Sequence, residues 1–112
     1  MEDPSTPDGT DPAEPGTVEV AFRCDPSKKE ATAMGMTAFF TQIIRARGIV
    51  KSMEELDDGR LVGFVAPPGT DLAQLARECT RAVQDAFREQ GIRTAWSLCM
   101  LDDQGRIYGL EP

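Results

Sequence analysis

The feature that most constrains the fold is an amphipathic helix pattern in the second half of the chain. One face of this predicted helix carries apolar and small residues: Leu72, Leu75, Ala76, Cys79, Ala82, Val83, Ala86 and Phe87. The opposite face carries charged residues: Arg77, Arg81, Asp85 and Arg88. Thr70 and Asp71 provide an N-terminal cap, and Gly91 is suited to close the helix. A helix with a single apolar face must bury that face against another layer of structure.

The rest of the chain alternates strand and helix patterns around this helix. Five strands are predicted, at residues 17–23, 49–56, 60–66, 93–101 and 106–111. Asp57-Asp58-Gly59 is a hairpin signal, and the segment Gly59–Phe64 returns in similar form as Gly105–Leu110. The order βαββαββ predicts an α+β fold, a ferredoxin-like split βαβ sandwich with an extra C-terminal strand. In that fold an antiparallel sheet carries both helices on one face.

The first helix is predicted to begin either at Asp25, with Pro26 in its first turn, or at a capping box formed by Ser27 and Glu30. It is predicted to end at Gly48, which is suited to be the left-handed closing residue. Its apolar residues spread over an arc of about 160°, which is wider than packing on one sheet face requires. Phe39 and Ile43 are therefore expected to form a shoulder that contacts a second subunit.

The first sixteen residues differ from the rest in composition. They hold four prolines, five acidic residues and no Lys or Arg. We expect residues 1–16 to form a disordered acidic tail and residues 17–112 to form a single α+β domain. The formal net charge is −7, but removing the tail leaves 12 basic and 14 acidic residues. A nearly neutral domain argues against nucleic-acid binding.

Several chemistries are excluded by residues that the chain lacks. It contains no histidine, which removes His-dependent catalysis and imidazole zinc sites. The acidic turns Asp57–Gly59 and Asp102–Gly105 are too short for a calcium loop. No catalytic, metal or cofactor site is predicted. No apolar run is long enough to cross a membrane, and the N-terminus does not resemble a secretory signal. Three cysteines at wide spacing favour a reducing cytoplasm.

Cys24 is the one credible reactive group, because it directly precedes the first helix and a helix N-terminus can activate a thiol. Asp25 beside it opposes this effect, and no histidine can act as a base.

Residues 60–67 partly match the RNA-recognition signature K/R-G-F/Y-G/A-F-V-x-F/Y. Arg60, Gly63, Phe64 and Val65 agree with it. Leu61, Val62 and Pro67 depart from it, and two of these replace the aromatic residues on which bases stack. RNA binding through Phe64 is therefore a minor alternative.

Side-chain alternation predicts an apolar sheet face opposite the helices. With Val18, Val20 and Phe22 turned toward the helices, the other face is expected to carry Val62, Phe64, Ala66, Ala21, Ala95 and Cys99. An exposed apolar face of this kind is usually buried against another surface. We therefore expect a homodimer that uses these residues, with Phe39 and Ile43 as the alternative surface.

The leading hypothesis is a non-enzymatic interaction or regulatory module that acts by self-association and protein binding. The alternative is a small-molecule-binding or thiol-dependent protein with a pocket near Cys24 at the subunit interface.

Overall fold

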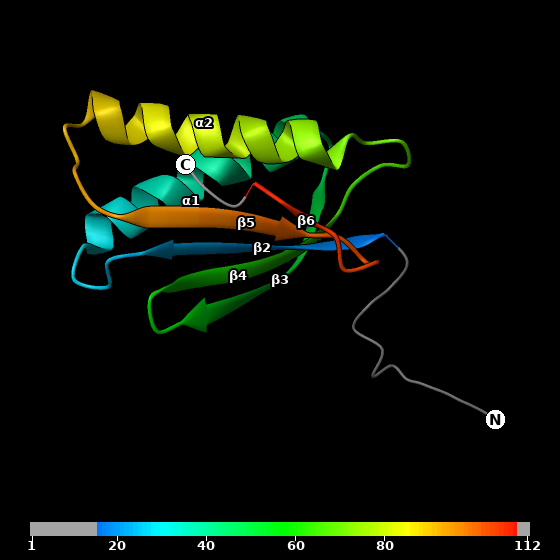
Figure 1. The fold of residues 1–112 in the computed structure, drawn as a ribbon, viewed down its shortest axis with the longest axis horizontal. Coiled ribbons are helices and arrows are strands. Elements are labelled where there is room, and N and C mark those ends of the chain that lie inside the picture. The colour runs from blue at the N-terminus through cyan, green and yellow to red at the C-terminus, as the bar shows by residue number, and fades with distance from the viewer. Residues whose placement is uncertain (1–15, 110–112) are drawn as a thin grey trace.

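A computed structural model describes residues 16–109. Its elements are β2 (Thr17–Cys24), α1 (Lys29–Arg45), β3 (Ile49–Leu56), β4 (Gly59–Val65), α2 (Leu72–Glu89), β5 (Trp96–Leu101) and β6 (Ile107–Tyr108). The five strands form one sheet in the order β3-β4-β2-β5-β6, and all neighbouring strands are antiparallel (Figure 1). The predicted α+β fold, with an antiparallel sheet and two helices, is confirmed. The predicted tail, apart from Gly16, and the end of the predicted last strand lie outside the described residues.

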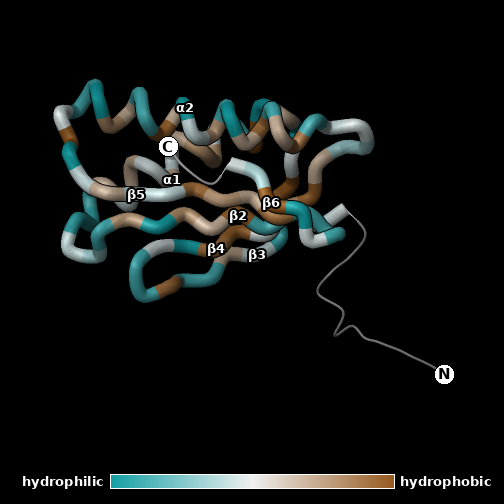
Figure 2. Tube along the Cα trace, viewed as in Figure 1, coloured by the Kyte–Doolittle hydropathy of each residue, from teal (hydrophilic) through white to brown (hydrophobic). Residues whose placement is uncertain are grey.

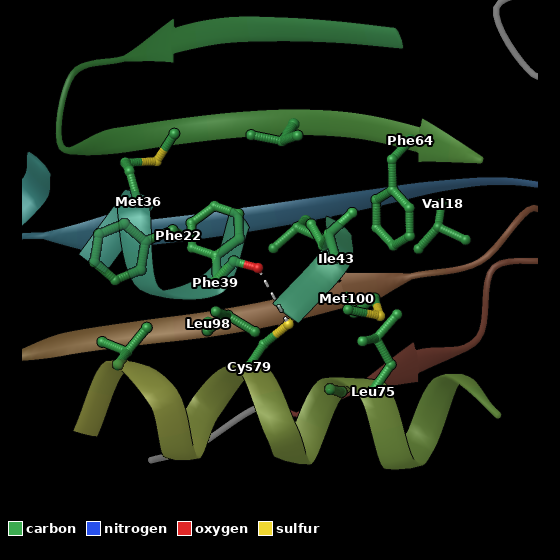
Figure 3. Close-up of a cluster of buried hydrophobic side chains, with 14 of the residues drawn as sticks. Val18, Phe22, Met36, Phe39, Ile43, Phe64, Leu75, Cys79, Leu98 and Met100 are labelled. Carbon is green, nitrogen blue, oxygen red and sulfur yellow. Dashed lines mark hydrogen bonds between the residues drawn. The ribbon is translucent and has the colours of Figure 1, made fainter. Parts of the chain in front are cut away.

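One apolar core lies between the sheet and the helices, which pack against each other (Figures 1 and 3). β2 sends Val18, Val20 and Phe22 into this core, as its alternation predicted. The centroid of the Phe22 ring lies 5.7 Å from that of Phe39 on α1 and 6.2 Å from that of Trp96 on β5. Each large apolar side chain buried in this way contributes about 1.5–3 kcal/mol to folding.

β4 faces the opposite way from the prediction. Val62 and Phe64 are both 0% exposed and point toward the helices, whereas Leu61 is only half-buried. The strand pairing explains this orientation, because Phe64 lies opposite Val18 and Val62 lies opposite Val20. Residues directly opposite each other share one side of a sheet, so the buried side of β2 fixes that of β4.

The predicted shoulder on α1 is also wrong. Phe39 and Ile43 are 0% exposed and pack in the core, while Ile44 is 62% exposed. The pairs Phe39 with Ile43 and Phe40 with Ile44 are both apolar and lie on neighbouring sides of the helix. The sequence pattern alone therefore could not show which pair is buried in the core.

The first turn of α1 begins later than predicted, at Lys29. Before it, the Asp25 carboxylate accepts hydrogen bonds from the backbone N–H and the hydroxyl of Ser27 at 2.9 and 2.8 Å. These two hydrogen bonds lower the pKa of Asp25, and the bond from the Ser27 backbone N–H has the larger effect. These bonds hold residues 25–27 in a turn rather than in the helix.

Both helices end in the same hydrogen-bond pattern with different residues in the left-handed position. In α1 the Gly48 N–H donates to the Ile43 carbonyl at 2.9 Å, and the left-handed residue is Arg47, with φ of 65°. The prediction that Gly48 takes this position is wrong. A Cβ at Gly48 would lie 2.7 Å from the Ile43 side chain, so packing excludes a larger residue. In α2 the left-handed residue is Gly91, with φ of 69°.

Between residues 16 and 109, neither helix combines the length and apolar character needed to cross a membrane.

Candidate functional site

The side of the sheet turned away from both helices is the candidate site, and we call it the open face. On β2, the central strand, it carries Thr17, Glu19, Ala21 and Arg23, which alternate with the buried residues. Ala21 lies directly between Leu61 of β4 and Cys99 of β5 in the strand pairing. These three residues form an apolar row across the three inner strands, and all three side chains are half-buried.

Further apolar residues flank this row at the other levels of the open face. Leu101 of β5 lies opposite both Glu19 and Ile107, and Val65 of β4 lies opposite Ile49. The two residues on the edge strands are the more exposed, with Ile49 at 61% and Ile107 at 54%. Figure 2 shows the apolar stretches along β2, β4 and β5, and polar turns on α2. A monomer ordinarily makes such a face polar.

The charged groups on β2 lie symmetrically about the apolar row. Glu19 and Arg23 are each two residues from Ala21, on the same side of the sheet. Arg23 makes an ion pair with Asp58 in the β3–β4 turn, and the two side chains are 51% and 43% exposed. A pair this exposed is weakly held, and a guanidinium has donors to spare for a second carboxylate.

The structure brings together only part of the predicted interface. Ala21 and Cys99 lie side by side on the open face, and Ala95 is exposed just before β5 begins. Val62 and Phe64 belong to the core, and Ala66 is half-buried against it beyond the end of β4. Sequence reasoning missed Leu61 and Val65, and only the pairing of β4 with β2 reveals their direction.

The observed orientation of β4 also buries Phe64, the residue on which RNA bases were expected to stack. Phe64 is 0% exposed, beneath the helices, where no base can reach it. Among the strand residues that the structure describes, Phe22 is buried, Trp96 packs edge-on to Phe87 at 5.9 Å, and Tyr108 donates a hydrogen bond to Asp102 at 3.1 Å. The open face of these residues therefore offers no aromatic ring for base stacking.

Cys24 lies at the end of β2 and is 4% exposed. Beside it is a shallow hollow of about 530 Å³, lined in part by Arg23, Asp58, Trp96 and Ser97. Arg23 and Ser97 belong to the open face as well, so the hollow adjoins the candidate interface.

The other two thiols differ sharply in surroundings. Cys79 is 0% exposed on α2 and contacts the Phe39 carbonyl at 3.8 Å (Figure 3). Burial, and then the nearby charge of Glu78, raise the pKa of Cys79 to about 12. Cys79 is therefore a structural thiol, and Cys99 is the most accessible of the three.

An ordered acidic turn joins β5 to β6. The Asp102 carboxylate accepts backbone hydrogen bonds from Gln104 and Arg106, at 2.9 and 2.8 Å, and the bond from Tyr108. Burial opposes ionisation of this group, but these hydrogen bonds and the Arg106 charge together lower the pKa of Asp102. The carboxylate is thus occupied in holding the turn. Among residues 16–109, no three potential ligands are grouped so that they could hold a metal ion.

Neither a comparison with known protein families nor a search of curated proteins finds a match to this chain.

Proposed function

We propose that this protein is a non-enzymatic interaction module that acts by self-association and protein binding through its open face. The observation that carries the proposal is the apolar row of Leu61, Ala21 and Cys99 across the inner strands. Ala21 and Cys99 are small, so a second surface can approach the sheet closely at this level. Leu61 then supplies a larger apolar side chain for that surface to bury.

The finer fold and location belong to the same proposal. The strand order β3-β4-β2-β5, with α1 and α2 as connections, supports a ferredoxin-like split βαβ sandwich to which β6 is added. All three cysteines are free thiols, which supports a reducing compartment such as the cytoplasm.

The size of the open face sets the expected strength of association. With strands about 4.8 Å apart and about 3.3 Å per residue, the observed lengths of the five strands give a face of about 500 Å². Two such faces in contact bury about 1,000 Å², which is in the range of weak protein interfaces. We therefore expect a dimer with a micromolar rather than a nanomolar dissociation constant.

Sedimentation velocity over a range of concentrations tests the proposal. The parent protein is expected to approach twice its 12.2 kDa mass, and Leu61→Asp is expected to remain a monomer because it places a carboxylate in the contact. Ile44→Asp is the matched control, since Ile44 is 62% exposed on α1, away from the open face.

Two results would reject self-association through the open face. One is a parent protein that stays monomeric at several hundred micromolar, far above the expected dissociation constant. The other is a Leu61→Asp variant that dimerises as the parent does.

The second candidate function is thiol-dependent or small-molecule binding at the hollow beside Cys24. Iodoacetamide alkylation followed across pH tests it, because an activated thiolate reacts well below the ordinary thiol pKa of about 8.5. Slow alkylation of Cys24 at neutral pH would remove this candidate.

A further inference from the structure

We infer that the open face binds a second copy of this chain in one orientation, with the two β2 strands antiparallel and Glu19 of each copy facing Arg23 of the other. The inference rests on the self-association proposed above and adds the orientation of the two copies. It follows from the arrangement of charge and size about Ala21.

Two-fold symmetry allows two simple ways to stack one sheet face on its own copy. The symmetry axis lies in the plane between the sheets, and it runs either along β2 or across it. An axis along β2 keeps the strands parallel and places Glu19 against Glu19 and Arg23 against Arg23. An axis across β2 at Ala21 reverses the strand and exchanges the two charged levels.

The charges of β2 select the second arrangement, although Glu54, which is exposed on the edge strand β3 and pairs with Leu61, then lies opposite Glu54 of the second copy. Glu19 and Arg23 are each about 7 Å along the strand from Ala21, so reversal brings each carboxylate opposite a guanidinium. Stacked sheets lie about 10 Å apart, a gap that a Glu and an Arg side chain span together. Two such pairs form by symmetry, whereas the parallel arrangement creates repulsion between like charges.

The apolar row fits the same axis. Leu61, Ala21 and Cys99 lie at one level of the sheet, so an axis across β2 passes along the row. Each residue of the row then meets the same residue of the second copy. At the next level, Leu101 comes opposite the small Ser97, because Leu101 pairs with Glu19 and Ser97 with Arg23. The charges of β2 and the sizes of the facing side chains on β5 thus favour one arrangement.

Two charge-reversal variants, used alone, mixed and combined in one chain, test the pairing. Glu19→Arg alone and Arg23→Glu alone each place like charges together at both symmetric positions, so each is expected to dimerise at least about ten-fold more weakly than the parent. An equimolar mixture is expected to recover dimerisation as a heterodimer, because each Arg then faces a Glu. The double variant Glu19→Arg/Arg23→Glu is expected to recover it as a homodimer.

A second pair of variants provides an independent test, since Arg23→Glu also removes the ion pair with Asp58. In the antiparallel arrangement Cys99 faces Cys99 of the second copy, whereas in the parallel arrangement it faces Leu61. Cys99→Asp and Cys99→Lys are each expected to dimerise at least about ten-fold more weakly than the parent. Their equimolar mixture is expected to recover dimerisation, because Asp then faces Lys, and in the parallel arrangement mixing would restore nothing.

The outcomes separate this inference from the proposed function. If the parent dimerises and Leu61→Asp dissociates it, but each single charge variant dimerises as the parent does and the mixture of Cys99→Asp with Cys99→Lys stays monomeric, the orientation is wrong and the open face remains the interface. A monomeric parent contradicts both.

Discussion

Side chains along each strand alternate between the two faces of the sheet, but the helices cover only one of these faces. On β2 the inward residues Val18, Val20 and Phe22 are at most 2% exposed, and the helices cover them. The outward Ala21 lies in a row of apolar side chains that no helix covers. The inward side chains specify the fold, because their burial is complete within one copy. The open face keeps apolar surface that folding alone does not use, and this difference is the reason for assigning function to it.

The largest expected difference in the free energy of unfolding is between substitutions on the two faces of β4. Phe64→Ala removes a ring that is 0% exposed and should lower the free energy of unfolding by about 3–5 kcal/mol. Leu61→Ala should cost the isolated protomer less than about 1 kcal/mol, because Leu61 is only half-buried. Urea denaturation at concentrations where the protein is monomeric measures both. Equal losses would show that the two faces are not distinct.

A pair of glycines gives the next contrast. A Cβ at Gly35 of α1 would lie 2.3 Å from the Phe22 ring, which neighbouring aromatic rings hold in place. Gly35→Ala should therefore destabilise by about 1–3 kcal/mol, less up to about 1 kcal/mol regained in helix propensity. At Gly63, on the open face, the Cβ would meet only the Ser52 hydroxyl, which can rotate away.

Thermal melting of both alanine variants measures this difference. Gly63→Ala is expected to change the midpoint little. A larger loss for Gly63→Ala than for Gly35→Ala would mean that the tight packing lies on the open face instead.

Alkaline pH should distinguish the buried Cys79 of α2 from Cys99 of the open face by their effects on stability. The pKa of Cys79 is raised to about 12 by burial, so the folded state keeps its proton after the unfolded chain has lost it. The thiol's contribution is complete below its unfolded pKa of about 8.5 and falls as pH rises toward 12, by about 1 kcal/mol per pH unit.

Denaturation between pH 9 and 11 checks this effect, with each variant compared with its own stability at pH 8. Cys79→Ala is expected to flatten the decline, and Cys99→Ala on the open face is expected to keep it. If Cys79→Ala leaves the slope unchanged, Cys79 is not the titrating group.

The element order was predictable because each segment carries its own local signal. The periodicity of α2, the Asp71 cap and the Asp57-Asp58-Gly59 turn depend only on neighbouring residues. The Asp71 carboxylate accepts the Gln74 N–H at 3.1 Å, and Gly59 begins β4. Such features do not depend on the partner of each segment, so the sequence alone was sufficient.

The side on which β4 faces was not predictable in the same way. Leu61, Val62, Phe64 and Val65 are all apolar, so alternation leaves both orientations open. The choice depends on the long-range pairing of Phe64 with Val18, which no local pattern reports. The predicted side-chain directions were consequently correct on β2 and β5, where alternation is clear, and wrong on β4.

The rate at which Cys99 reacts with a monofunctional maleimide tests the central claim most directly. Cys99 belongs to the apolar row, whereas Cys24 and Cys79 are 4% and 0% exposed. If copies cover the open face, the rate at Cys99 should fall several-fold as the protein is concentrated through its micromolar dissociation constant. In Leu61→Asp it should stay constant. A Cys99 rate in the parent that is the same at every concentration would contradict the account.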